Sequence, residues 1–208
     1  MAEPLPVTAS QTIGPFYGYA LPFTGGADLV PAGHPDAVVV HGYVIDGAGA
    51  PIPDAMLEFW QAAPDGSLDG APGSLRRDQT TGAVLGRDHT RFTGFARVCT
   101  DADGHYAMRT LTPAALGACA PYLSVCVFAR GLVHHLFTRV YFADQPAANA
   151  TDPLLSALDE PRRATLVARL ERAATHRFDV RIQGGNGGVR AAGDAGAVET
   201  VFLDFSGS

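Results

Sequence analysis

The sequence contains no lysine, and its fifteen basic residues are all arginines scattered along the chain. Acidic residues number 21, which gives a formal net charge of -6. A surface for nucleic acid or for an anionic membrane would need clustered positive charge, so we expect neither partner. The chain also lacks the long apolar run of a membrane span and the basic start of a signal peptide, which predicts a cytoplasmic protein.

Cysteine is scarce as well. The chain has three cysteines, Cys99, Cys119 and Cys126, so their number is odd. No two of them show the Cys-x-x-Cys spacing. This pattern argues against both a disulfide framework and a zinc ribbon. We therefore expect the three thiols to be reduced and packed inside the protein.

The sequence patterns of a metal or nucleophile site are also missing. His134 and His135 are the only adjacent histidines, and neighbours on a strand point to opposite faces. Neither His-x-His nor Gly-x-Ser-x-Gly occurs. Surface positions or ordinary hydrogen bonds are expected for the isolated histidines His34, His41, His89, His105 and His176. The sequence therefore predicts no metal site within this chain.

Glycine and proline are abundant, with 24 and 15 of the 208 residues, and they imply many turns. Between them lie short apolar or alternating runs of strand length. We expect strands over residues 37–45, 56–61, 94–99, 105–110, 122–129, 137–142, 175–182 and 198–205. This pattern predicts an all-β chain, folded as an antiparallel β-sandwich of immunoglobulin or transthyretin-like shape.

Three segments differ in texture from these strands. Residues 1–36 carry six prolines and predict an extended N-terminal arm, followed by the sandwich over residues 37–205 and a tail at 206–208. Residues 64–93 are polar and rich in glycine, and we expect one long loop there. A short helical insertion is expected over residues 152–173, because an aspartate can cap it and a proline follows at its first position.

Five stretches of the chain occur in an order that is specific to one protein family. They read SQTIGPFY at residues 10–17, EFWQA at 58–62, FARG at 128–131 with TRVYF at 138–142, FDVRIQG at 178–184, and ETVFLDF at 199–205. Together they span nearly the whole chain. On these stretches the chain resembles the α subunits of the intradiol ring-cleaving dioxygenases.

This resemblance implies an α/β hetero-oligomer of several αβ units, in which both subunits share a β-sandwich fold. It implies that ferric iron, Fe(III), is held by the partner β subunit through two tyrosines and two histidines. The αβ unit would take a small aromatic substrate, a dihydroxybenzoate, and cleave its ring with O2 to 3-carboxy-cis,cis-muconate.

In this chain the family's four ligand positions carry other residues. The resemblance places the two tyrosine ligands at Leu68 and Leu116, counted from the shared Trp-Gln-Ala and Thr-Pro stretches. The His-x-His of the catalytic subunit falls on Tyr122 and Ser124. Leucine cannot bind Fe(III), and a lone phenol and hydroxyl would hold it poorly. The resemblance therefore implies the non-catalytic subunit, without a metal site of its own.

In the family, the arm and one arginine of the α subunit lie at the mouth of the partner's pocket. The matching positions in this chain are Thr12, Gly14, Pro15, Phe16 and Arg130. The family's Gly-Pro-Tyr reads Gly-Pro-Phe here, so a hydroxyl at that point would have to come from Tyr17. Arg130 has two open roles, an attraction for the substrate carboxylate and an ion pair with the partner.

Two other residues of the shared stretches, Trp60 and Tyr141, are expected to pack in the core. Two alternative functions are a stand-alone β-sandwich that acts as a binding or interaction module, and a self-sufficient dioxygenase. The missing His-x-His disfavours the second. The aromatic arm at residues 10–19 disfavours the first, because an isolated module has no evident use for it.

Overall fold

The computed structural model describes residues 14, 16–70, 75–183 and 198–205 of the chain. These residues are mostly β structure, which confirms the predicted class. The strands are β1 (Ala37–Ile45), β2 (Met56–Trp60), β3 (Leu75–Arg77), β4 (Val84–Arg87), β5 (Phe95–Cys99), β6 (His105–Leu111), β7 (Tyr122–Phe128), β8 (Leu136–Phe142), β9 (Val167–Arg172), β10 (Thr175–Arg177) and β11 (Val180–Arg181). The helices are α1 (Tyr17–Ala20), α2 (Pro146–Thr151), α3 (Pro153–Ala157) and α4 (Glu160–Ala164).

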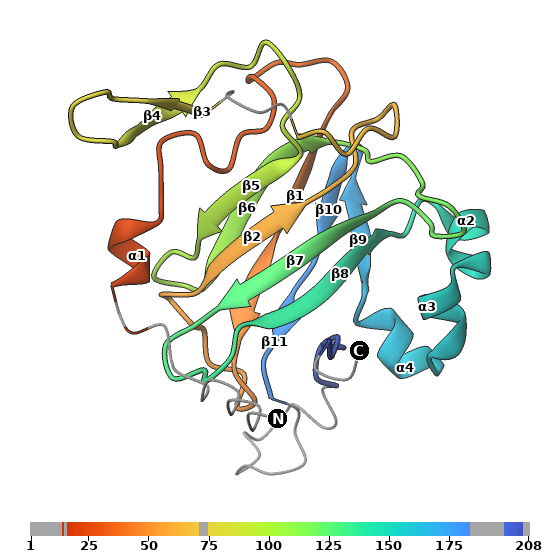
Figure 1. Cartoon of the computed structure of the whole chain (residues 1–208). Coiled ribbons are helices and arrows are strands. Elements are labelled where there is room, and N and C mark those ends of the chain that lie inside the picture. The colour runs from red at the N-terminus through yellow and green to blue at the C-terminus, as the bar shows by residue number, and fades with distance from the viewer. Residues whose placement is uncertain (1–13, 15, 71–74, 184–197, 206–208) are drawn as a thin grey trace, which may run out of the picture.

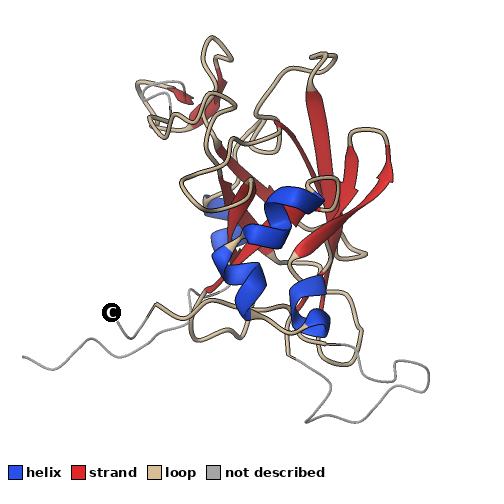
Figure 2. Cartoon of the chain, turned by 90° about the vertical axis from the view of Figure 1, so that its right-hand side faces the viewer, coloured by secondary structure: helices blue, strands red, loops and turns tan. Residues whose placement is uncertain are grey.

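Two groups of paired strands meet at β9. One group follows the order β6-β1-β10-β9 and the other the order β5-β2-β7-β8-β9, while β11 pairs with the end of β1. In Figure 1 the strands β2, β7 and β8 cross in front of β1 and β10. Helices α2, α3 and α4 lie together at one side of the strands, where they face the viewer in Figure 2.

The hydrophobic core lies between the two groups of strands. Residues of β1 alternate between buried and half-exposed, as the neighbours Val40 and His41 illustrate. This period of two is the one expected for a strand with one buried face. Phe59 of β2 contacts Tyr106 of β6 with ring centroids 5.8 Å apart, so side chains from both groups meet in the core.

Strand pairing is mixed, and the prediction of a purely antiparallel arrangement is wrong. β1 pairs in parallel with β10 and β11, and β8 pairs in parallel with β9. These partners come from the C-terminal part of the chain and return to the sheets across long connections. Gly42 permits the close crossing beside β1, because an added Cβ would lie 1.8 Å from the carbonyl oxygen of Phe178.

The helix predicted over residues 152–173 is confirmed up to residue 164, as two short helices, and wrong beyond it. Asp152 caps α3 as expected, since its carboxylate accepts hydrogen bonds from the amides of Leu154 and Leu155. The chain then forms α4, which Asp159 caps, and continues as the strand β9. β9 pairs with β8 on one edge and with β10 on the other, and these tertiary pairings override the local helix propensity.

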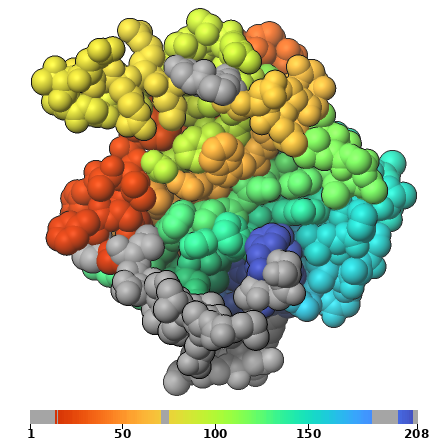
Figure 3. All heavy atoms as spheres, in the orientation of Figure 1, coloured from red at the N-terminus to blue at the C-terminus, as the bar shows by residue number. Residues whose placement is uncertain are grey.

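Three further predicted segments differ from the structure. Residues 175–182 hold two short strands, β10 and β11, in place of one. Residues 198–205 form no strand, and their only bridge joins Leu203 to Phe137. Residues 64–93 hold the β3–β4 hairpin in place of one continuous loop, and this hairpin projects from the body in yellow in Figure 3.

The described part of the arm is folded onto the body. Where an extended chain was predicted, α1 forms a helical turn. The Arg97 amide donates to the Gly26 carbonyl at 3.0 Å, and the Leu29 amide donates to the Arg109 carbonyl at 2.9 Å. Leu29 is buried and belongs to the core, and the domain boundary at residue 36 stays a prediction. None of the helices described is long and apolar enough to cross a bilayer.

Candidate functional site

The four positions predicted to match the family's iron ligands lie around one cavity. Leu68 comes from the loop after β2, Leu116 from the loop before β7, and Tyr122 and Ser124 from β7 itself. β2 and β7 are antiparallel neighbours with Trp60 opposite Ser124, so both loops lie at the same end of the sheet. The cavity that they line has a volume of about 130 Å³.

Few atoms in this cavity can bind a metal. Of the four positions, Leu68 and Leu116 have hydrocarbon side chains, which leaves the phenol of Tyr122 and the hydroxyl of Ser124. The other side-chain oxygens in the lining of the cavity are neutral ones of Gln61 and Thr93. The guanidinium carbon of Arg139 lies 4.1 Å from the centre of the Tyr122 ring, and Arg139 is the cross-strand partner of Ser124. A guanidinium at that place repels a metal cation. These residues do not fit Fe(III), which needs several imidazole, phenolate or carboxylate ligands.

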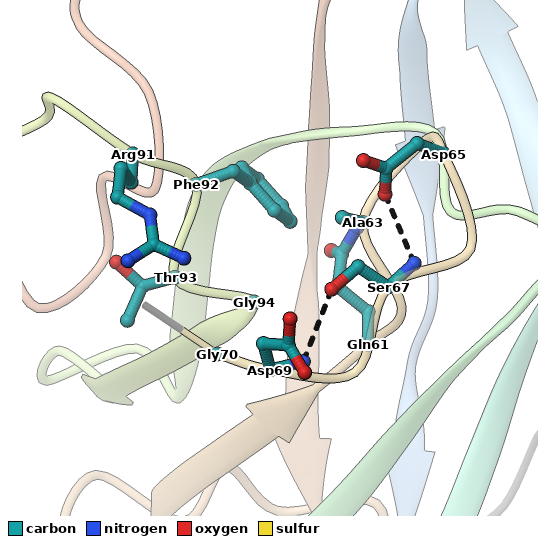
Figure 4. A pocket seen from close by; sticks show the side chains of 10 residues that line it. All are labelled: Gln61, Ala63, Asp65, Ser67, Asp69, Gly70, Arg91, Phe92, Thr93 and Gly94. Carbon is teal, nitrogen blue, oxygen red and sulfur yellow. Dashed lines mark hydrogen bonds between the residues drawn. The ribbon is translucent and has the colours of Figure 1, made fainter. Parts of the chain in front are cut away.

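A larger hollow of about 230 Å³ continues from this cavity and is drawn in Figure 4. Gln61, Gly70 and Thr93 contribute to the walls of both. The side-chain amide of Gln61 donates to the Leu111 carbonyl at 2.9 Å, and its oxygen accepts a hydrogen bond from the Thr110 hydroxyl at 2.6 Å. Gln61 is therefore held in place as a wall of the hollow.

Charged side chains line the outer part of this hollow. Asp65, Ser67 and Asp69 lie on the loop after β2, and Arg91 and Phe92 lie across from them on the segment before β5 (Figure 4). The Ser67 amide donates to the Asp65 carboxylate at 2.9 Å, and the Asp69 amide donates to Ser67 Oγ at 3.2 Å. These bonds hold the loop in tight turns. The rim of the hollow is therefore polar and charged.

The arm residues that are predicted to lie at the mouth of the partner's pocket are found at a second place. Thr12 and Pro15 are outside the described residues, and Gly14 has a left-handed backbone with φ of 73°. The ring of Phe16 is 76% exposed, whereas Tyr17 is 5% exposed. A phenyl ring as exposed as that of Phe16 is available to a partner.

The side chains of Tyr17 and Arg130 both form hydrogen bonds with Asp54. The Tyr17 hydroxyl donates a hydrogen bond to the backbone carbonyl of Asp54, and Nε of Arg130 donates to the Asp54 carboxylate at 2.5 Å. Burial raises the pKa of Tyr17 above its ordinary value, and the negative charge of Asp54 adds to this effect. The Tyr17 hydroxyl is therefore neutral and engaged within this chain, while the side chain of Arg130 stays 69% exposed.

The prediction that Trp60 and Tyr141 pack in the core is confirmed for Tyr141 and wrong for Trp60. Tyr141 is fully buried, and its hydroxyl donates to the carboxylate of Asp152 at 3.1 Å. Trp60 is 52% exposed and lies against Phe95 with ring centroids 4.4 Å apart. It falls on the outer face because alternation along β2 turns Phe59 inward.

A third hollow of about 460 Å³ lies over the outer face of β2, β7 and β8. Its walls carry the rings of Trp60, Phe128, Phe137 and Phe205. Trp60 and Phe205 are 52% and 61% exposed. Exposed aromatic groups around one hollow are typical of surfaces that bind another molecule.

Sequence reasoning missed two charged residues at these places. Asp54 follows a Pro-Ile-Pro segment that signals only a turn, and nothing in the sequence indicates its contacts with the arm. Arg139 belongs to a recognised stretch, but its position beside Tyr122 depends on the pairing of β7 with β8. A cross-strand neighbour of this kind is visible only once the register is known.

The chain is similar to one protein family and to two subunits of one enzyme. Residues 14–123 match the family described as Dioxygenase. The chain is 41% identical to the protocatechuate 3,4-dioxygenase alpha chain of Burkholderia cepacia, over 95% of this chain and 96% of that protein. It is 27% identical to the beta chain from the same organism, over 86% and 77% of the two chains.

Among solved structures, the chain is similar to the dioxygenase domain of a carbohydrate-binding fusion protein from Streptomyces sp. SirexAA-E. The TM-score is 0.54 and the identity 25%, over 76% of this chain and 87% of that one. Sequence and structure thus agree on one family. The chain belongs to the intradiol ring-cleavage dioxygenases and is homologous to the subunits of protocatechuate 3,4-dioxygenase.

Proposed function

We propose that this chain is the non-iron-binding α subunit of protocatechuate 3,4-dioxygenase. In the proposed αβ enzyme, the β subunit holds Fe(III), and ring opening of 3,4-dihydroxybenzoate with O2 takes place there. This chain, a β-sandwich subunit, lines the mouth of the partner's pocket and stabilises the complex. The 41% identity to an alpha chain supports the assignment.

One observation carries this proposal. The four positions predicted to match the family's iron ligands line one cavity, and two of them, Leu68 and Leu116, have no ligand atoms. Arg139 adds a positive charge beside Tyr122 and Ser124. A cavity with these walls favours a subunit that has kept the fold of a dioxygenase without its metal chemistry.

The exposed aromatic surface supports a β partner and a larger (αβ)n oligomer. Phe16, Trp60 and Phe205 are each more than half exposed, and Trp60 and Phe205 line one hollow. Large aromatic side chains are typical of the centres of protein interfaces. The three free thiols fit a reducing compartment, so we expect the complex in the cytoplasm.

In this proposal Arg130 acts at the pocket mouth. Its Nε bonds to Asp54, which fixes the side chain. The two Nη groups of the guanidinium then remain for a carboxylate, either that of the substrate or one of the partner. Phe16 would supply an aromatic wall next to it, because its ring is exposed on the same arm whose Tyr17 bonds to Asp54.

The decisive experiment purifies the chain alone and together with a β subunit. We would measure iron content, the visible absorption spectrum and protocatechuate-dependent O2 uptake of both preparations. We expect a colourless, inactive chain and a coloured, active complex. Colour and activity of the chain alone would overturn the proposal, and failure to bind any β subunit would favour a stand-alone binding module.

A single variant tests whether iron is bound by this chain within the complex. Among the described residues that line the cavity of about 130 Å³, Tyr122 is the one with a phenol. Replacing it by Tyr122→Phe keeps the ring and removes the oxygen, so a complex whose iron lies in the β subunit should keep its colour. Bleaching of the complex by Tyr122→Phe would show that this chain supplies a ligand.

A further inference from the structure

Two histidines that are distant in the sequence lie side by side on the outer face of β1 and β6. In the antiparallel ladder Tyr43 is opposite His105, and His41 is opposite Ala107. His41 and His105 are therefore diagonal neighbours on one face of the pair, where both side chains remain partly exposed. The nearest ring nitrogens, Nδ1 of His41 and Nε2 of His105, are 3.2 Å apart.

A carboxylate faces the other nitrogen of each ring. Nε2 of His41 lies 3.0 Å from Oε2 of Glu171 on β9, and Nδ1 of His105 lies 3.9 Å from Oδ2 of Asp101. The side chain of Asp101 is fixed in the turn between β5 and β6, because its carboxylate accepts a hydrogen bond from the His105 amide at 2.9 Å. Metal-binding histidines in proteins are typically oriented in this way, by a carboxylate on the nitrogen that faces away from the metal.

The Glu171 carboxylate favours one tautomer of His41. A carboxylate accepts hydrogen bonds only, so it favours N–H on Nε2 of His41, which leaves a lone pair on Nδ1. Without a metal ion, Nε2–H of His105 donates to this lone pair at 3.2 Å. If His105 carries its proton on Nδ1, toward Asp101, both inner nitrogens can bind one cation. The pair is therefore arranged to share a proton or to bind a metal ion.

Two carboxylates face the histidine pair, and arginines lie beside it. Glu171 and Asp101 face the rings, Arg177 on β10 is the register partner of His41, and Arg169 on β9 is opposite Arg177. Nε of Arg177 bonds to both carboxylate oxygens of Asp179 at 3.0 Å, and its Nη1 lies 3.7 Å from Glu171. Asp179 thus pairs with Arg177, and the two carboxylates that face the rings, Glu171 and Asp101, supply the negative charge that a cation needs.

We propose that His41 and His105 form a site for a divalent transition-metal ion of the Zn²⁺ or Cu²⁺ class. Zn–N bonds of 2.0–2.1 Å at the tetrahedral angle place two ligand nitrogens about 3.3 Å apart, close to the 3.2 Å observed. Glu171 and Asp101 orient the rings, and water completes the coordination. Among the residues described, no group of three or more such side chains surrounds one point, so the proposed site has two protein ligands.

The proposal is independent of the dioxygenase function, and its test does not depend on activity. The full chain, in its complex with a β subunit where it needs one, would be titrated with Zn²⁺ against a chromogenic chelator at pH 7.5. We expect one preferred ion per chain and tighter binding of Cu²⁺ than of Zn²⁺. His41→Gln and His105→Gln should each weaken Zn²⁺ binding at least tenfold, and Glu171→Gln about 10–100-fold.

Matched controls separate this site from adventitious binding by surface histidines. The exposed His134 gives the control His134→Gln, which should leave Zn²⁺ affinity unchanged. Zn²⁺ should also raise the melting temperature of the unsubstituted protein, because it binds the folded state, and this rise should be absent in His41→Gln. Equal affinity of His41→Gln and the unsubstituted protein would overturn the proposal, as would an equal loss in His134→Gln.

Discussion

The hydroxyl of Tyr17 donates its hydrogen bond to the backbone carbonyl of Asp54, and this contact joins the arm to the body of the chain. The carboxylate of the same Asp54 binds Arg130. One residue thus orients both the helical turn α1 and the loop after β7. Loosening this contact should change how both segments are presented to a partner.

Tyr17→Phe tests the strength of this connection. We expect the free energy of unfolding to fall by about 1 kcal/mol, because the substitution removes the hydrogen bond to Asp54 from a buried ring. Urea denaturation followed by fluorescence measures the change. Tyr19→Phe is the matched control, since the Tyr19 ring is 89% exposed, and it should leave the stability unchanged. Equal effects of the two variants would contradict this role of Tyr17.

Arg130→Gln in the αβ complex tests the two roles of this arginine. We expect KM for protocatechuate to rise about tenfold, equivalent to roughly 1.4 kcal/mol, with little change in kcat. Attraction for the substrate carboxylate acts equally in the ground state and in the transition state. Steady-state O2 uptake measures both constants, and Arg76→Gln on the exposed strand β3 is the control. An unchanged KM with weaker subunit association would assign Arg130 to the interface.

Asp152 should be the more important of the two helix-capping aspartates. Its buried carboxylate accepts bonds from the amides of Leu154, Leu155 and Ala120 and from the Tyr141 hydroxyl. Asp152→Ala leaves these groups unsatisfied and should lower the free energy of unfolding by about 3 kcal/mol. Asp159→Ala should cost about 1 kcal/mol, because that exposed cap accepts one amide of α4. Chemical denaturation of both variants would refute this ranking if the losses were equal.

His176 should make stability depend on pH. Burial lowers its pKa below the ordinary value of 6.5, although the nearby Asp144 opposes this. The unfolded chain then binds the proton more readily than the folded one. The contribution of His176 is complete above pH 6.5 and is lost as the pH falls below it toward the folded pKa. The difference in unfolding free energy between pH 7.5 and 5.5 should shrink in His176→Gln and persist in His134→Gln.

Cys126 should be the least reactive of the three free thiols. Burial, with a smaller effect of Glu58, raises the pKa of Cys126 to about 12. Since the thiolate is the reactive form, iodoacetamide should modify Cys126 more slowly than the half-exposed Cys119 at pH 8. The rate at Cys126 should rise about tenfold per pH unit between pH 8 and 11. Mass spectrometry of the folded protein measures both rates, and comparable values at pH 8 would contradict the expectation.

Local pattern was sufficient for the strands that alternate cleanly. The strand at residues 37–45 has the predicted bounds, because each buried residue is followed by an exposed or half-exposed one. Pattern failed at β9, whose residues fit a helix equally well and become a strand only by pairing with β8 and β10. The pattern failed again at residues 198–205. β9 pairs with one end of β8, at Tyr141 and Phe142, and residues 198–205 bridge to β8 only through Leu203 and Phe137.

Motif spacing was equally uneven for the candidate site. It brought together Leu68, Leu116, Tyr122 and Ser124, which line one cavity, while their match to iron-ligand positions stays a prediction. The charge that accompanies them comes from Arg139, which only the strand register reveals. His41 and His105 show the same limit, since 64 residues separate two side chains whose rings are in contact.

The position of β1 has a consequence for the synthesis of this chain. One edge of β1 pairs with β6 soon after it is made, but the other edge must wait for β10, which begins at residue 175. The interval from Ile45 to Thr175 is 130 residues, or roughly 7 to 26 s of translation at 5–20 residues per second. During that time one edge of the apolar strand β1 stays unpaired on the ribosome, where chaperones can bind it. Faster synthesis of the C-terminal part should therefore increase the yield of folded protein.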